Sequence, residues 1–283
     1  MKGDTRAIGI FDSGIGGLTV ATAIRQALPR ERLLYFGDNA HVPYGPRPVA
    51  EIQDFSRGIT EAMIAAGCKL IVIACNTASG AALQQLRKEY PALDLVGMEP
   101  AVKPAVEHTR TGVVGVIATT YTVQGEVFNS IVERFAQDVE VLRQPCPGLV
   151  TQIEAGEFDT PRTLEMLHGW IDPMLERGID VLVLGCTHYP IIRNVIEQVT
   201  GPGVRVIEPS DAIARRVEQV LRERDILAPA GAEGGLHAFT SGDPQHFREM
   251  MERIGIASDA VHHAPWEEGR LSLDGSPSLN HPA

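Results

Sequence analysis

Two cysteines of this chain stand at matching places, each directly after an apolar run and at the start of a polar turn. The run Leu70–Ala74 leads into Cys75–Thr77, and the run Val181–Gly185 leads into Cys186–His188. A thiol between a strand end and a helix start is favoured as the thiolate by the helix dipole. One thiolate can remove a proton from a carbon while a second thiol protonates the opposite face. The pair therefore predicts inversion of a stereocentre.

Each thiol has a candidate acid–base partner in the sequence. Asp12 directly follows an earlier apolar run, Ala7–Phe11, and His188 stands two residues after Cys186. A proton donor or acceptor beside a thiol assists each proton transfer. By the symmetry of the two halves, we assign Asp12 to Cys75 and His188 to Cys186.

The polar turns lack the residues that would hold a cofactor. None of them carries a lysine for pyridoxal phosphate, and the cysteines and histidines of the chain form no metal-ligand spacing. The Cα–H bond of an amino acid is far less acidic than a thiol, so the site must stabilise a carbanion with fixed dipoles and exclude water. We therefore predict chemistry without a cofactor or a metal.

Side chains around the cysteines offer hydrogen bonds to a small anion or an ammonium group; they are Asn76, Thr77 and Thr187. The turn Asp12–Gly17 contains Ser13 and glycines that permit close approach of an anion to the next helix start, but it matches no nucleotide fingerprint. Its counterpart, Thr119–Thr122, supplies hydroxyls that either hold a carboxylate or cap the next helix.

Two further segments have open interpretations. The loop Pro43–Gly45 either lays the Tyr44 ring or its backbone donors over a ligand, or is an ordinary surface loop. Glu154 ends an apolar helical stretch and is either an inward carboxylate or exposed. Cys68 and Cys146 lie outside such turns and are interpreted as packing. The histidines other than His188 are interpreted as non-catalytic.

Composition limits the partners and the setting. The 283 residues are 44% hydrophobic and 22% charged, with a net charge of −11, so nucleic acid is not an expected partner. No apolar stretch approaches the roughly 20 residues of a membrane helix, and the N-terminus lacks the apolar region of a secretory signal. The four cysteines form no CxxC pair, which favours free thiols in the cytoplasm.

Short apolar runs alternate with amphipathic helical patterns, which predicts an α/β fold with doubly wound, mostly parallel sheets. The runs are continuously apolar, as expected where helices cover both faces of a sheet. The expected strands are Ala7–Phe11, Leu33–Phe36, Leu70–Ala74, Leu93–Gly97, Val113–Ile117, Val139–Leu142, Val181–Gly185, Val204–Ile207 and, more weakly, Leu236–Thr240. Apolar stripes predict helices over 52–63, 123–135, 164–175, 213–221 and 247–254.

The chain also repeats itself weakly. Gly9–Ser13 resembles Gly115–Thr119, 106 residues later, and the Cys75 turn recurs 111 residues later at Cys186. We therefore expect two pseudo-symmetric domains with the active site in the cleft between them. The expected boundaries are 1–99 with 209–266 for the first domain and 100–208 for the second. Residues 267–283, rich in Ser, Pro and Gly, are expected to be disordered.

At these residues the chain resembles the glutamate racemases, a family within the aspartate/glutamate racemase superfamily. The motifs are spread from about residue 7 to about residue 210. They are Phe11–Val20, Pro43–Gly45, Ala74–Ala78, Glu99–Ala101 with Lys103–Ala105, Ile153–Gly156 and Gly185–Pro190. The resemblance implies cofactor-independent interconversion of L- and D-glutamate, which supplies D-glutamate for peptidoglycan. It also implies two α/β domains and a homodimer, with no membrane partner.

The resemblance also implies roles for individual residues. Cys75 would be the base for D-glutamate and Cys186 the base for L-glutamate, and Asp12, Glu154 and His188 would assist proton transfer. The implied substrate-binding residues are Asp12, Ser13, Tyr44, Gly45, Asn76, Thr77, Thr119, Thr122, Thr187 and His188.

Two alternatives remain open from the sequence. An aspartate racemase, or a related amino-acid racemase, shares the paired-cysteine plan. A non-enzymatic amino-acid binding protein would need no second cysteine, so replacing either thiol would leave it functional.

Overall fold

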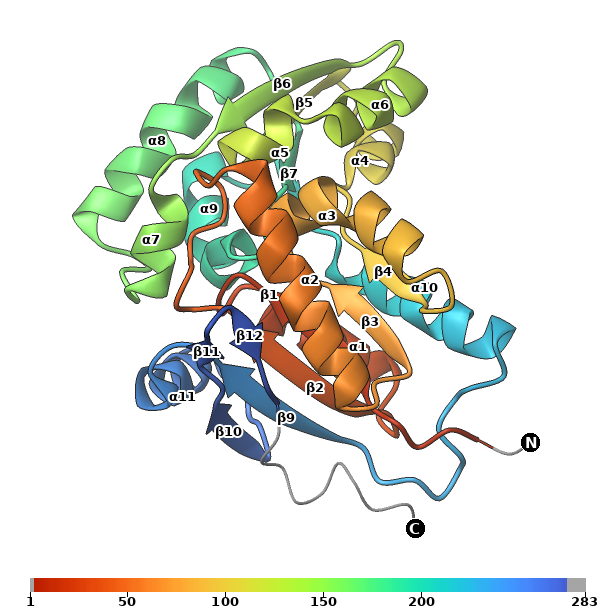
Figure 1. The fold of residues 1–283 in the computed structure, drawn as a ribbon. Coiled ribbons are helices and arrows are strands. Elements are labelled where there is room, and N and C mark those ends of the chain that lie inside the picture. Colours follow the sequence, from red (N-terminus) through yellow and green to blue (C-terminus); the bar gives the residue numbers. More distant parts are fainter. Residues whose placement is uncertain (1–2, 274–283) are drawn as a thin grey trace. The chain divides into compact units, whose positions relative to one another are not determined.

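A computed structural model describes residues 3–273 of the chain (Figure 1). The described residues form two compact units. The first unit takes in those up to Met98 and those from Ser210 onward, and the second unit is Glu99–Pro209. Each unit is built on a parallel sheet, as the continuous apolar runs predict.

The sheet of the first unit has the strand order β10-β9-β2-β1-β3-β4, and every neighbouring pair is parallel. Strands β1 and β3 are buried throughout, and β2 is buried after its first residue. Because these strands are parallel neighbours, the carboxyl ends of β1, β2 and β3 lie side by side at one edge. The strands are β1 (Ile8–Asp12), β2 (Arg32–Gly37), β3 (Leu70–Ile73), β4 (Leu95–Gly97), β9 (Gly235–Thr240) and β10 (Ala260–His263).

Helices cover both faces of this sheet. The chain steps from β1 to β2 in one direction and from β2 across β1 to β3 in the other. Right-handed crossovers therefore place α1 on one face and α2 with α3 on the other. In agreement, α1 packs against α10 and α2 packs against α3. The helices are α1 (Leu18–Ala27), α2 (Val49–Ala65), α3 (Asn76–Glu89), α10 (Ser210–Glu223) and α11 (Pro244–Arg253).

The C-terminal segment of the first unit is more ordered than the sequence predicts. We expected disorder from residue 267 onward. Instead β11 (Trp266–Glu267) and β12 (Arg270–Leu271) form an antiparallel hairpin, β12 contacts α2, and Leu273 is buried. Packing of the Trp266 indole holds this segment in place although its composition is polar. Residues 274–283, the rest of the expected disordered stretch, lie outside the described residues.

The second unit carries a smaller parallel sheet of order β6-β5-β7-β8. Its strands are β5 (Val113–Ala118), β6 (Glu140–Pro145), β7 (Val181–Leu184) and β8 (Arg205–Ile207). Its helices are α4 (Val102–His108), α5 (Thr120–Gln124), α6 (Glu126–Phe135), α7 (Leu149–Glu154), α8 (Pro161–Glu176), η1 (Tyr189–Ile192) and α9 (Arg193–Thr200). Apolar side chains of α4 and α6 pack on β5 and β7 to form its core.

One expected helix is divided. The apolar stripe over 123–135 predicts a single helix, but the structure ends α5 at Gln124 and starts α6 at Glu126. Gly125 between them has an extended backbone, with φ −70° and ψ 152°. Glycine has a weak helix preference, and here it serves as the N-cap of α6.

The two units share the local plan that the weak repeat predicts. Ala74, directly before Cys75, donates its N–H to the Phe11 carbonyl at 2.7 Å. Gly185, directly before Cys186, donates its N–H to the Ile117 carbonyl at 2.8 Å. Each cysteine therefore leaves its strand at the same register beside the first strand of its unit. Among the described residues, no helix combines the length and apolar character that a membrane span requires.

Candidate active site

The first set of predicted site residues gathers at the carboxyl ends of β1 and β3, where parallel sheets present their ligand sites. Cys75 is the N-cap of α3, and its Sγ accepts a hydrogen bond from the Ala78 N–H at 3.4 Å. The side chain is buried. The start of a helix favours negative charge, so this position suits a thiolate.

Asp12 ends the neighbouring strand and is completely buried. Its Oδ2 accepts a hydrogen bond from the Gly17 N–H at 2.8 Å. A Cβ at Gly17 would lie only 2.7 Å from the Asp12 Cβ and 3.0 Å from the Tyr35 hydroxyl, so only glycine can close this turn. The turn also holds Ser13, which is buried. The prediction of a tight polar turn at Asp12 is therefore confirmed.

Among the polar side chains at this edge, Asn76 gives the clearest indication of a ligand site. It is buried, and neither its Oδ1 nor its Nδ2 has a hydrogen-bond partner among the described residues. A buried polar group without a partner costs roughly 1–3 kcal/mol, and such a group calls for an explanation. A bound molecule with a donor and an acceptor would satisfy both atoms. Thr77, the next residue, is also buried.

The loop after β2 contributes Tyr44 and the half-buried Gly45. The Tyr44 ring is only 1% exposed, and its hydroxyl donates to Asp38 Oδ2 at 2.6 Å. Burial, followed by the Asp38 carboxylate, raises the pKa of the Tyr44 phenol well above its usual value, and the charges of Cys75 and Asp12 act in the same direction. The buried ring is therefore an internal support of the loop, and the backbone groups of the loop are left as its candidate ligand contacts.

The second set gathers at the carboxyl end of β7. Cys186 and His188 are buried, and the Cys186 Sγ lies 3.9 Å from the His188 Nδ1. The opposite ring nitrogen, Nε2, lies 2.5 Å from the Glu154 Oε1 at the C-terminal end of α7. In a neutral imidazole that donates Nε2–H to this carboxylate, Nδ1 is the acceptor that faces the thiol. Of the two open interpretations, Glu154 is the inward carboxylate.

The hydroxyl-bearing residues of the second unit lie at the end of β5 and in the Cys186 turn. Thr119 is the N-cap of α5: its Oγ1 accepts from the Thr122 N–H at 3.2 Å and lies 3.0 Å from the Thr122 hydroxyl. The helix-capping interpretation of these threonines is therefore confirmed, and capping still leaves hydroxyl lone pairs for a ligand. Thr187 is buried beside Cys186.

The other two cysteines, Cys68 and Cys146, are free and buried as well. Burial raises the pKa of Cys68 to about 12. Burial also raises the pKa of Cys146, and the neighbouring Cys186 adds to that effect. Both thiols therefore stay protonated at neutral pH, in keeping with packing roles. No group of three or more candidate metal ligands occurs in the part of the chain that the structure describes.

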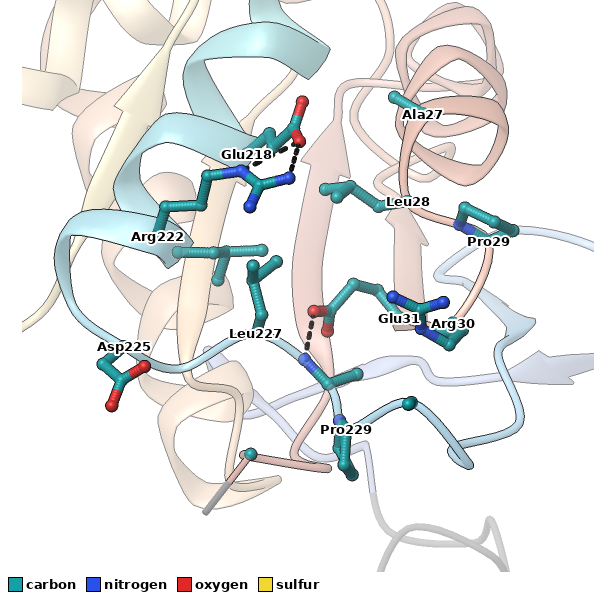
Figure 2. Close-up of a pocket in the computed structure, with 14 residues that line it drawn as sticks. Ala27, Leu28, Pro29, Arg30, Glu31, Glu218, Arg222, Asp225, Leu227 and Pro229 are labelled. Carbon is teal, nitrogen blue, oxygen red and sulfur yellow. Dashed lines mark hydrogen bonds and ion pairs between the residues drawn. The ribbon is translucent and has the colours of Figure 1, made fainter. Parts of the chain in front are cut away.

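A pocket of about 720 Å³ lies elsewhere, beside the amino end of β2 (Figure 2). Three of its charged side chains, Glu31, Glu218 and Arg222, are engaged in ion pairs or hydrogen bonds. Glu31 accepts from the Ala228 N–H at 2.7 Å and pairs with Lys69, and Arg222 pairs with Glu218. Ligands of open α/β sheets bind at the opposite, carboxyl ends of strands. This pocket is therefore not the candidate active site.

Sequence reasoning missed Asp38, which is completely buried and binds the Tyr44 hydroxyl. A signal was present: Asp38 follows the apolar run Leu33–Phe36 closely, much as Asp12 follows Ala7–Phe11. A carboxylate directly after a buried strand is the pattern that singled out Asp12.

Comparison with known proteins identifies the family. The model of the Asp/Glu/Hydantoin racemase family matches residues 17–217. The chain belongs to this family. It is therefore an enzyme of the racemase class, and the family that the sequence motifs resemble is confirmed.

Individual relatives match nearly the whole racemase. A glutamate racemase from Roseiflexus sp. is 44% identical over 260 residues, which cover 92% of this chain and 96% of the relative. One from Stutzerimonas stutzeri is 48% identical over 244 residues, which cover 86% and 92%. The crystal structure of glutamate racemase isoform RacE1 from Bacillus anthracis superposes with a TM-score of 0.83 at 32% identity, covering 94% and 98% of the two chains. The predicted parallel α/β fold is confirmed.

Proposed function

We propose that this racemase interconverts L-glutamate and D-glutamate by proton transfer at Cα between Cys75 and Cys186, without a cofactor. The observation that carries the proposal is the equivalence of the two cysteine turns, each leaving its strand after the same backbone hydrogen bond. The many glutamate racemases among the relatives support glutamate as the substrate.

In the proposed direction from L- to D-glutamate, the Cys186 thiolate removes the Cα proton. The C–H bond breaks, an S–H bond forms, and the electron pair stays on the substrate as a carbanion. The Cys75 thiol then gives its proton to the opposite face and becomes the thiolate. The scheme requires the two thiols to face opposite sides of one carbon. The reverse reaction exchanges the two roles.

His188 and Asp12 support the proposed proton transfers in different ways. The Nδ1 acceptor of His188 can take the thiol proton of Cys186, and Glu154 then stabilises the imidazolium through Nε2. Asp12 has the equivalent place in the first unit, as a buried carboxylate at the end of the strand beside β3. A carboxylate on one side and an imidazole on the other make the two half-reactions chemically distinct.

The remaining predicted residues would bind the substrate. The unpartnered Asn76 amide can donate to a substrate carboxylate and accept from its ammonium group. Hydroxyls and backbone groups of Ser13, Tyr44, Gly45, Thr77, Thr119, Thr122 and Thr187 would complete the binding, together with Asp12 and His188. In the cell, the enzyme would act in the cytoplasm as a homodimer and supply D-glutamate for peptidoglycan, with neither nucleic acid nor membrane as partner.

The decisive test incubates purified protein with L-glutamate in D₂O without added cofactor. We expect the circular dichroism of the substrate to decay to zero while deuterium replaces the Cα proton. Cys75→Ser and Cys186→Ser should each abolish turnover, and Cys68→Ser is the matched control that should retain it. Full racemisation by either of the first two variants would overturn the two-base scheme.

The same assay with other substrates separates the alternatives. Turnover of L-aspartate in preference to L-glutamate would identify a related amino-acid racemase instead. Glutamate binding without exchange of the Cα proton, unchanged by both cysteine substitutions, would indicate a binding protein.

A further inference from the structure

The Asp38 carboxylate is a buried junction beside the candidate active site. It directly follows β2, and its N–H donates to the Asp12 carbonyl at 3.0 Å. The side chain is completely inaccessible to solvent. A charge in this position persists only where donors surround it.

Four side chains surround this carboxylate, and they come from three distant parts of the first unit. Ser241 Oγ and Trp266 Nε1 donate to Oδ1 at 2.7 Å and 2.8 Å. The Tyr44 hydroxyl donates to Oδ2 at 2.6 Å, and His41 Nδ1 lies 2.9 Å from the same oxygen. Hydrogen bonds to an ionised acceptor are the stronger kind, so Asp38 ties the three segments together.

Ring packing holds the Trp266 indole in place. Its ring meets the His41 ring edge-on, with centroids 5.6 Å apart, and lies 5.9 Å from the Phe55 ring. His41 in turn stacks on Phe55 at 4.0 Å. A Cβ at Gly58 of α2 would come within 2.7 Å of the indole, so the ring lies directly on that helix. The C-terminal hairpin, β11 with β12, is thus anchored to the loop that carries Tyr44.

We propose that Trp266 is a positioning residue for substrate binding: through Asp38 it holds the Tyr44–Gly45 loop at the carboxyl edge of the sheet. This inference rests on the proposed function, because it assigns the loop to substrate binding. Tyr44 touches Asp38 on one oxygen while Trp266 and Ser241 occupy the other. Removing either of these two donors takes one hydrogen bond away from Oδ1 of a completely buried carboxylate, and the carboxylate shifts or takes up water to replace it. The loop held by its other oxygen then loses its fixed position.

The positioning role of Trp266 affects substrate binding and not the proton transfers. Trp266 and Ser241 both donate to Asp38 Oδ1, so they act on the Tyr44–Gly45 loop through that carboxylate and have no part in the proposed proton transfers. We therefore expect a rise in KM with kcat nearly unchanged. A purely structural role would lower the melting temperature and leave KM as it is.

The test compares Trp266→Phe and Ser241→Ala with wild type in the racemisation assay. Trp266→Phe keeps an aromatic ring but removes the N–H donor, and Trp170→Phe in α8 of the second unit is the matched control. We expect KM to rise about tenfold in each of the first two variants, with kcat within about twofold of wild type. The double variant should show a non-additive effect, because both donors act on one oxygen. Trp170→Phe should match wild type.

Each outcome decides one question. If wild type turns over glutamate but KM is unchanged in the Ser241→Ala variant and in a folded Trp266→Phe variant, the positioning role is wrong. Ser241→Ala removes one hydroxyl and keeps the test valid even where Trp266→Phe does not fold. If wild type itself shows no turnover, the proposed function fails, independently of the role of Trp266.

Discussion

The Glu154 carboxylate lies 2.5 Å from Nε2 of His188, 34 residues away in the chain. This contact fixes the tautomer of the imidazole and leaves Nδ1 facing the Cys186 thiol at 3.9 Å. On the Cys75 side, the helix start and the buried Asp12 carboxylate provide the electrostatic setting.

Glu154→Gln tests this contact. The amide can donate to Nε2, which favours the opposite tautomer and removes the acceptor from the thiol. We expect kcat/KM to fall about 10²- to 10⁴-fold. Because the two enantiomers have equal free energies in water, kcat/KM must fall equally in both directions. Glu157→Gln, at an exposed glutamate three residues after the end of α7, is the control. Circular dichroism of both enantiomers measures the rates, and a variant with wild-type kcat/KM would exclude a role for Glu154.

Asn76→Ala tests the unpartnered amide. A side chain that only packs would lower stability when it is truncated, whereas this one has no hydrogen bond to lose within the described residues. We expect KM for glutamate to rise about tenfold with no loss of stability to urea. Ser79→Ala provides the contrast. Its hydroxyl donates to the Ile73 carbonyl at 3.0 Å and accepts from the Met98 N–H at 2.8 Å, so we expect a stability loss of about 1–3 kcal/mol. An unchanged KM in Asn76→Ala would rule out substrate contact.

Lys69→Met tests the ion pair beside the pocket of Figure 2. Lys69 Nζ lies 2.7 Å from Glu31 Oε2, and both side chains are almost completely buried. Removing the cation leaves a buried, uncompensated carboxylate, and we expect the free energy of unfolding to fall by about 3–5 kcal/mol. The double variant Glu31→Gln/Lys69→Met should recover part of this loss. Urea unfolding measures both, and equal stability of Lys69→Met and wild type would contradict the prediction.

His237 makes stability depend on pH. Burial lowers its pKa below the ordinary value of 6.5. The positive charges of Arg32 and His262 act in the same direction, and Asp259 opposes them. The unfolded chain therefore binds a proton more readily than the folded protein. The free energy of unfolding that depends on neutral His237 is fully present above pH 6.5. It is lost as the pH falls toward the lower pKa of His237 in the folded protein.

Urea unfolding between pH 7.5 and pH 5 measures this contribution. The free energy of unfolding should decline less steeply with falling pH in His237→Gln than in wild type. For one proton the slope of this decline is at most about 1.4 kcal/mol per pH unit. His168→Gln, at an exposed helix position, is the control that should leave the decline unchanged. An identical pH profile for His237→Gln and wild type would contradict the assignment.

Much of the fold was predictable because its signals are local. The runs Val113–Ile117 and Val181–Gly185 are apolar throughout, as central parallel strands must be, and both appear as strands. The missed strand β10 reads Ala-Val-His-His and lies at the sheet edge, where burial no longer demands an apolar run. The hairpin at Trp266 was missed because its order comes from Asp38, 228 residues earlier.

The sequence by itself determined which chemical groups stand at strand ends: two cysteines, Asp12 and His188, each after an apolar run. Strand burial and turn chemistry depend on neighbours in the chain, so they can be read from it. Only the tertiary structure decided that Glu154 binds His188, that the Asn76 amide has no partner within residues 3–273, and that Trp266 reaches Asp38. Hydrogen bonds tolerate only a few tenths of an ångström, and the path of the whole intervening chain sets whether distant groups meet within that tolerance.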